Sequence, residues 1–276
     1  MPQVINTNIL SMTAQANLSK TAASLATSVQ RLSSGLRINN AMDDPAGLAI
    51  SMRMGSQASG MHVAIRNAND AISLTQVADG TLGTVGDMLQ RMRDLAVQAA
   101  NQTNGSSDLA NLNTEFTSLA GEINRELTST KFNGIAVLGT GAGTQTYQVG
   151  ANNGDTITLT TSNLTTNTSV TAVTGTTATI LSTASASAMI NTIDTALTTI
   201  NTERATYGAD QSEFNAVISN LQIGVTNQAA AESRIRDADY AQETANLTRA
   251  QILQQAGTAM LAQANALPQS VLALLK

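Results

Sequence analysis

One short stretch of this chain carries residue types that could do acid–base or metal chemistry. Asp43 and Asp44 are adjacent carboxylates followed by Pro45. Such a pair could act as an acid and a base, or hold a metal ion. The same residues fit the start of a helix, with Asp44 as the N-cap and Pro45 as the first helical residue. We favour this structural interpretation.

The other candidates for chemistry are isolated. His62 is the only histidine of the 276 residues, so we interpret it as an ordinary helix residue. The glycine-rich stretch 139–143 lacks the lysine of a phosphate loop and the spacing of a dinucleotide fingerprint, and we expect a flexible turn there. Without cysteine, thiol catalysis, disulfides and iron–sulfur clusters are excluded. We predict no catalytic residue, no metal and no cofactor, and a protein that is not an enzyme.

Composition narrows the partners. Hydrophobic residues make up 42% of the chain, aromatic residues 2% and charged residues 12%, about half the ~25% charged residues typical of soluble domains. The net charge of -5 argues against nucleic acid as a partner. The N-terminus lacks the basic region of a signal peptide, and Gln, Asn and Pro interrupt the uncharged stretch 254–275. We expect no membrane insertion, and either a cytoplasmic location or export without a cleaved signal.

Both ends of the chain show apolar residues at heptad spacing, which predicts paired helices. The N-terminal seam is Leu18, Ala22, Leu25, Val29, Leu32 and Leu36. The C-terminal seam is Leu253, Gly257, Met260, Ala264, Leu267, Val271 and Leu274. Pro268 should kink or restart this second helix. Because residues 1–19 and 250–275 carry no charge, we predict that these seams serve self-assembly.

The inner segments repeat the helical period, and the centre of the chain changes it. Helical spacing recurs over 85–96, 190–207 and 214–225. Alternating residues flank Asn152–Asp155, which predicts a β-hairpin near 145–160. The Thr-rich residues 162–184 fit either a further β-turn insertion or a mobile loop. The predicted fold is mainly α: an elongated helical bundle or coiled coil, formed by pairing of the N- and C-terminal segments, with a small central hairpin.

These patterns suggest three regions. Residues 1–44 and 235–276 form a terminal coiled-coil domain. Residues 45–160 and 188–234 form a helical rod domain that includes the hairpin. Residues 161–187 form a short variable insertion.

Several longer motifs resemble those of the bacterial flagellins, the subunits of the flagellar filament. In the N-terminal half the motifs are RLSSGLRIN at 31–39, DDPAGLAI at 43–50 and NANDAISL at 67–74. In the C-terminal half they are AESRIRDAD at 231–239 and QANALPQSVL at 263–272. The resemblance covers roughly residues 1–160 and 190–276, and the centre is short compared with large flagellins.

The resemblance implies a structural role: self-assembly into the extracellular helical filament used for swimming. A hook–filament junction protein of the same export system is the alternative. Implied partners are further flagellin copies, the type III export apparatus, an export chaperone on residues 240–276, and the filament cap and hook-associated proteins. Arg91, Leu95, Gln98 and Glu115 match positions through which some flagellins engage a Toll-like receptor, and the same face could instead make protofilament contacts.

Overall fold

The computed structural model describes residues 7–274, with side chains to residue 267, and these residues form two compact units. The described part of unit 1 comprises residues 7–56 and 227–274, and unit 2 comprises residues 57–226. The division falls inside two long helices, α2 (Pro45–Ala99) and α5 (Thr183–Arg236). Helices dominate both units, which confirms the predicted mainly α fold.

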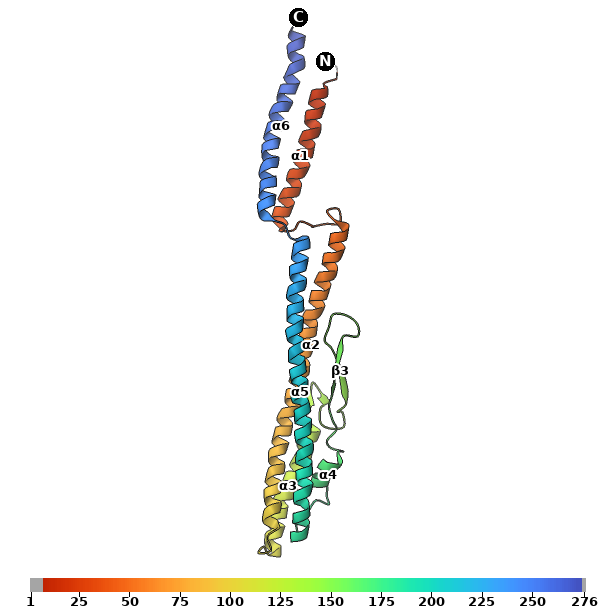
Figure 1. Cartoon of the computed structure of the whole chain (residues 1–276), viewed down its shortest axis with the longest axis vertical. Helices are drawn as coiled ribbons and strands as arrows, with labels where there is room; N and C mark the ends of the chain where they lie inside the picture. The colour runs from red at the N-terminus through yellow and green to blue at the C-terminus, as the bar shows by residue number, and fades with distance from the viewer. Residues whose placement is uncertain (1–6, 275–276) are drawn as a thin grey trace. The chain divides into compact units, whose positions relative to one another are not determined.

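Unit 1 contains the two ends of the chain as an antiparallel helix pair (Figure 1). The helices are α1 (Ile9–Ser34) and α6 (Tyr240–Leu274). The Asn8 side chain caps α1 by accepting a 3.1 Å hydrogen bond from the Ser11 N–H, and it donates to the Ala264 carbonyl at 2.8 Å. The predicted pairing of the chain ends is therefore confirmed. Helix α6 continues through Pro268 to Leu274. The restart that we considered possible at Pro268 therefore does not occur.

Backbone hydrogen bonds join the two segments that follow α1 and precede α6. The Arg37 N–H donates to the Arg236 carbonyl at 2.7 Å, and the Ala238 N–H donates to the Gly35 carbonyl at 2.9 Å. Gly35 has φ 73°, a left-handed conformation that ends α1 and that glycine adopts without steric cost. These hydrogen bonds hold together the segment by which the chain leaves the helix pair, residues 35–38, and the segment by which it returns, residues 235–238.

The two aspartates that could have formed a chemical site are structural. The Asp44 carboxylate accepts a 2.9 Å hydrogen bond from the Gly47 N–H, and α2 begins at Pro45. The N-cap prediction for Asp44 is therefore confirmed. Asp43 accepts two 3.1 Å bonds from the N–H groups of Asn39 and Asn40, which hold the pKa of its carboxyl below the usual value.

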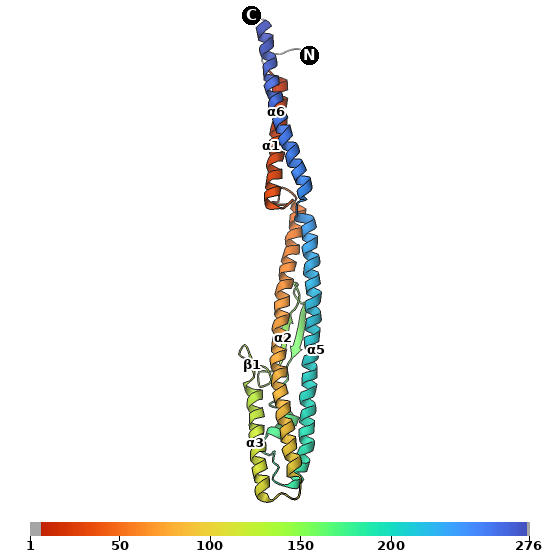
Figure 2. The ribbon, with the colours of Figure 1, turned by 90° about the vertical axis from the view of Figure 1, so that its left-hand side faces the viewer.

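In unit 2, α2 and α5 run side by side with α3 (Ser106–Ser129) packed along them (Figure 2). The fully buried rings between these helices are those of Phe116, Tyr207 and Phe214, and most of the other buried side chains are aliphatic. The core residues at the predicted helical spacing are Val85, Leu89, Met92, Ala96, Ile193 and Ile200, all fully buried.

Four short strands form two antiparallel pairs. The first pair is β1 (Lys131–Phe132) with β2 (Ile135–Ala136), and the second is β3 (Thr144–Gln148) with β4 (Thr156–Thr160). The second pair confirms the predicted central hairpin. The stretch 139–143 forms the expected turn before it, with the Ala142 N–H bonded to the Gly139 carbonyl at 2.9 Å.

The Thr-rich residues 162–184 form neither a further β-turn insertion nor a mobile loop, the two structures that the sequence left open. It contains the short helix α4 (Thr168–Thr174), which Asn167 caps by accepting a hydrogen bond from the Ser169 N–H. Val170, Val173 and Ile180 are buried in the core of unit 2. These few apolar residues, two of them one turn apart on α4 and one beyond its end, dock an otherwise polar segment.

Candidate assembly surfaces

The face of α1 that packs against α6 follows a heptad register, and it includes several polar residues. Its buried or half-buried positions are Ser11, Ala14, Leu18, Thr21, Leu25, Ser28 and Leu32. Leu18, Leu25 and Leu32 are members of the seam expected from the sequence. Val29 instead lies on the flank and is 51% exposed. Leu36 lies beyond the helix, where it forms a β-bridge with Asp237.

The packed face of α6 includes Gly257 and Ala264 of the expected seam, but not its larger members. Its positions are Glu243, Leu247, Ala250, Gln254, Gly257, Leu261 and Ala264. Leu253, Met260 and Leu267 lie beside this packed face and are 52%, 63% and 47% exposed, and Leu253 also borders the groove between α1 and α6. We call these three residues the α6 outer stripe. The expected seam residues Val271 and Leu274 fall among the side chains that the structure does not describe.

The two helices approach closely because the packed faces carry small residues. A Cβ atom at Gly257 would lie 3.1 Å from the Leu18 side chain, so these two residues are already in near contact. With alanine, glycine, serine and threonine in the seam, the pair buries little apolar area. At about 25 cal/mol per Å², this seam stabilises the pair weakly and leaves the outer stripe uncovered.

The polar residues of the seam were missed because a search for apolar periodicity passes over them. Ser11, Thr21 and Ser28 lie at the seven- and three-residue intervals of Leu18 and Leu25. That interval is a signal in the sequence, but it is visible only once the apolar positions are fixed. Glu243 and Gln254 on α6 are of the same kind.

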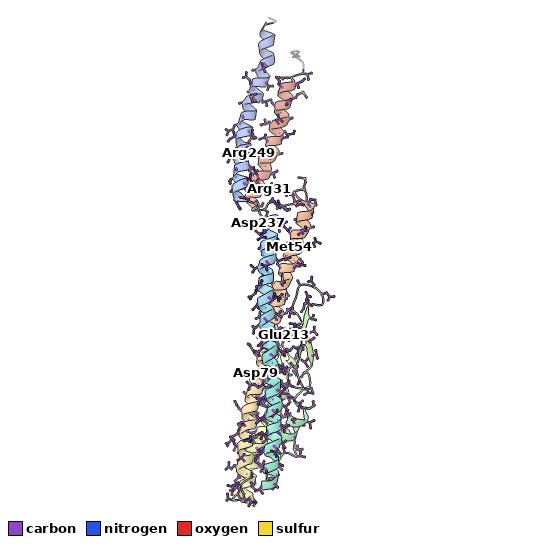
Figure 3. The ribbon with its side chains drawn as sticks, in the orientation of Figure 1. Arg31, Met54, Asp79, Glu213, Asp237 and Arg249 are labelled. Atoms are coloured by element: carbon purple, nitrogen blue, oxygen red, sulfur yellow. The ribbon has the colours of Figure 1, made fainter. Side chains whose placement is uncertain are left out.

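A surface groove between α1 and α6 carries most of the charge of this pair. Arg31 and Glu243 face each other across it at 3.9 Å, and Glu243 is almost completely buried. Lys20 and Arg249 also line the groove, and Figure 3 marks Arg31 and Arg249. A buried acid with a single distant partner contributes less to stability than to fixing how two helices align.

A second exposed surface lies on α2 and α3. Arg91 and Glu115 form an ion pair at 2.7 Å, and both side chains are about half exposed. Gln98 is exposed on the same helix as Arg91, and its carbonyl accepts a 2.6 Å hydrogen bond from Asn104. Leu95 was expected on this face, but its side chain is buried in the core of unit 2. Of the four expected residues, a partner on this surface would therefore meet Arg91, Gln98 and Glu115.

The other ion pairs described in unit 2, which include those of Arg125 with Glu122 and Glu126, are also at the surface. Arg93 pairs with Asp194 at 2.7 Å, and the bond to this carboxylate raises the pKa of the guanidinium. Arg204 pairs with Asp79 at 2.8 Å. Exposed pairs of this kind contribute little to folding. Within residues 7–274, no three histidine, aspartate or glutamate side chains gather as metal ligands would.

These features define a class of protein: an α-helical structural subunit whose two chain ends pair around a thin seam. Uncharged apolar side chains remain on the outside of that pair. None of the helices in the described part of the chain is both long and apolar enough to cross a membrane. Comparison with known proteins agrees with this class and gives the family.

The model of the bacterial flagellin N-terminal helical region matches residues 5–142, and that of the C-terminal helical region matches residues 190–275. A flagellin of Halalkalibacterium halodurans is 44% identical, over 99% of this chain and 100% of that protein. A flagellin of Xenorhabdus nematophila is 40% identical, over the full length of both. The chain therefore belongs to the bacterial flagellin family.

Two solved structures share the fold. Bacillus cereus flagellin is 37% identical and covers 60% of this chain and 94% of its own, with a TM-score of 0.51. A protein described as flagellar hook-associated, from Vibrio parahaemolyticus, covers 71% of this chain and 100% of its own with a TM-score of 0.58. At 14% identity this second likeness concerns the fold alone.

Proposed function

We propose that this flagellin is the structural subunit of a helical flagellar filament, and that the α6 outer stripe packs against neighbouring copies. The observation that supports this proposal is the stripe itself. Its three large apolar side chains are exposed in the single chain, and they lie on a segment, residues 250–275, that carries no charge. When a second copy covers this surface, each Å² of apolar area removed from water stabilises the contact by about 25 cal/mol. Contacts that repeat without closing build a helical polymer. No observation favours the hook–filament junction alternative.

Assembly should also complete the folding of the two arms. The thin seam between α1 and α6 has to offset the entropy of ordering 61 helical residues, 26 in α1 and 35 in α6. We expect both arms to be largely unfolded in the free subunit and to fold as copies pack together. Hydrogen exchange measured on free subunit would contradict this if residues 7–34 and 240–274 were already protected.

A charge in the outer stripe tests the assembly surface. Leu253→Asp should raise the critical concentration for polymerisation at least about tenfold, because a buried Leu contributes 1.5–3 kcal/mol. Gln255→Asp, two residues away on an exposed position of the same helix, adds the same charge outside the stripe and should change it far less. Circular dichroism of each free variant checks that unit 2 is still folded. Equal effects of the two variants would contradict the role of the stripe.

The hydrogen-bonded segments 35–38 and 235–238 lie inside unit 1, and they support a boundary between arm and rod near residues 44 and 235, closer to the chain ends than the division of the two compact units. Hydrogen bonds between 35–38 and 235–238 close the arm pair before α2 begins. We infer an arm domain of residues 1–44 and 235–276, a rod domain of 45–160 and 188–234, and the α4-containing insertion 161–187. If limited proteolysis cuts the filament, we expect the cuts within residues 161–187. The arm and rod domains should stay uncut.

Membership of the family supports a proposal for the location and the export partners. We infer an extracellular filament, reached through a type III export apparatus, with further contacts to the filament cap and hook-associated proteins. An export chaperone would hold the C-terminal arm, residues 240–276, and cover the outer stripe before assembly. Leu253→Asp should then weaken chaperone binding as well as polymerisation, which a binding assay with the free subunit would measure.

The Arg91–Glu115 surface has two candidate roles. It could form a protofilament contact or bind a Toll-like receptor, and we favour the contact between subunits. Arg91→Ala should leave folding unchanged, because the ion pair is exposed. A rise in critical concentration supports the contact, whereas lost receptor signalling with normal polymerisation supports the receptor alone.

A further inference from the structure

We propose that Met260 makes assembly of this protein sensitive to oxidation, because its thioether in the free subunit is converted to a sulfoxide that the filament cannot bury. This inference rests on the proposed assembly role of the outer stripe. Met260 lies at the centre of that stripe, seven residues from Leu253 and seven from Leu267. Its side chain is 63% exposed in the single chain.

The methionines of the chain differ strongly in access to solvent. Met92 and Met189 are buried in the core of unit 2, where an oxidant cannot reach the sulfur. Met12, Met42 and Met52 are exposed like Met260, and Met42, in the segment between α1 and α2, is 92% exposed. These three lie outside the outer stripe. Exposure therefore leaves four of these six sulfur atoms open to an oxidant, and of the four only Met260 lies in the outer stripe proposed to pack against neighbouring copies.

The reaction is a two-electron oxygen transfer from a peroxide. A lone pair of the methionine sulfur attacks one peroxide oxygen and the O–O bond breaks. The sulfur keeps that oxygen as a sulfoxide, and the other oxygen leaves as water after a proton transfer. The sulfur is oxidised and hydrogen peroxide is reduced, with no further reagent. Reductases with a thiol donor reverse the change.

The sulfoxide alters the physical character of the stripe. It replaces a flexible apolar group by a polar, strongly hydrogen-bonding one. No charged side chain lies between residues 250 and 275 to compensate it. Losing the burial of a methionine should raise the critical concentration roughly tenfold or more. In an assembled filament, the neighbour that covers Met260 should also protect its sulfur from the oxidant.

The experiment uses the full-length subunit and two matched variants. Met260→Leu keeps an apolar side chain in the stripe and removes the reactive sulfur. The triple variant Met12→Leu, Met42→Leu, Met52→Leu removes the other three exposed methionines of the described residues and keeps Met260. Each is treated with hydrogen peroxide as free subunit and as filament, mapped by peptide mass spectrometry, and assayed for critical concentration.

We expect peroxide to raise the critical concentration of the natural protein and the triple variant about tenfold or more, and to leave Met260→Leu nearly unchanged. Methionine sulfoxide reductases should restore assembly. The proposal is overturned if Met260→Leu loses assembly as the natural protein does, or if subunits with oxidised Met260 polymerise normally. Failure of the stripe itself would be seen separately, as normal assembly of unoxidised Leu253→Asp.

Discussion

Gly47 donates its backbone N–H to the Asp44 carboxylate at 2.9 Å and has no room for a side chain. A Cβ atom there would overlap that carboxylate and lie 2.7 Å from the Ile38 side chain. Gly47→Ala should therefore break the N-cap of α2 or displace the buried Ile38, at a cost of about 1–3 kcal/mol. Thermal denaturation of filaments and hydrogen exchange over residues 35–50 would measure it.

Gly80→Ala is the matched control, because it also lies in α2 but has open space around it. Alanine is favoured over glycine in a helix by about 0.5–1 kcal/mol. This variant should therefore be slightly more stable than the natural protein. If both substitutions had the same sign, steric exclusion at Gly47 would be wrong.

Tyr207 predicts a loss of stability at high pH. Burial, and then the carboxylate of Glu203, raise the pKa of its phenol to about 12, which outweighs a backbone contact at Ser162. Since an unfolded tyrosine ionises near 10, the neutral ring stabilises the fold below pH 10 and this contribution is lost as the pH rises toward 12. The loss should approach about 2–3 kcal/mol, measured by denaturant unfolding of unit 2 in the full chain between pH 9 and pH 12.

Tyr207→Phe separates this effect from other alkaline changes. The hydroxyl is buried without a well-formed hydrogen bond, so at neutral pH the Phe variant should be within about 1 kcal/mol of the natural protein. Its stability should fall less between pH 10 and 12. Identical alkaline losses in the two proteins would assign the effect to another group.

Acid should release the turn before α2. The N–H groups of Asn40 and Asn39 lower the pKa of Asp43, so the carboxylate stabilises the turn above the ordinary pKa and the stabilisation is lost as pH falls through the lower folded value. Backbone exchange at Asn39 and Asn40, corrected for its intrinsic pH dependence, should therefore speed up at the acid end. Asp43→Ala should show the fast exchange at every pH.

The sequence predicted the helices, their pairing and the central hairpin because each follows from a local period or a turn motif. It predicted the packed side of each arm only in part: Leu18, Leu25 and Leu32 of α1 pack as expected, whereas on α6 only the small members of the expected seam do. Leu253, Met260 and Leu267 alternate with Gly257 and Ala264 in the expected seam, and apolar periodicity alone does not tell which of these two sets is buried. The structure buries the small residues, because they allow α1 and α6 to approach closely. The docking of Val170 and Val173 was also unpredictable, because it depends on a groove made by distant helices.

The contact between Leu18 and Gly257 tests this arrangement of the arms. A Cβ atom at residue 257 would lie 3.1 Å from the Leu18 side chain, so Gly257→Leu should force α1 and α6 apart and cost about 1–3 kcal/mol in the filament. Leu18→Ala in the same chain removes the obstructing side chain and exchanges the large and small residues across the seam. The double variant should recover much of the loss, with a coupling energy of about 0.5–3 kcal/mol, measured from filament melting. Additive losses would mean that the two residues do not meet in the filament, and that another pairing of the arms forms there.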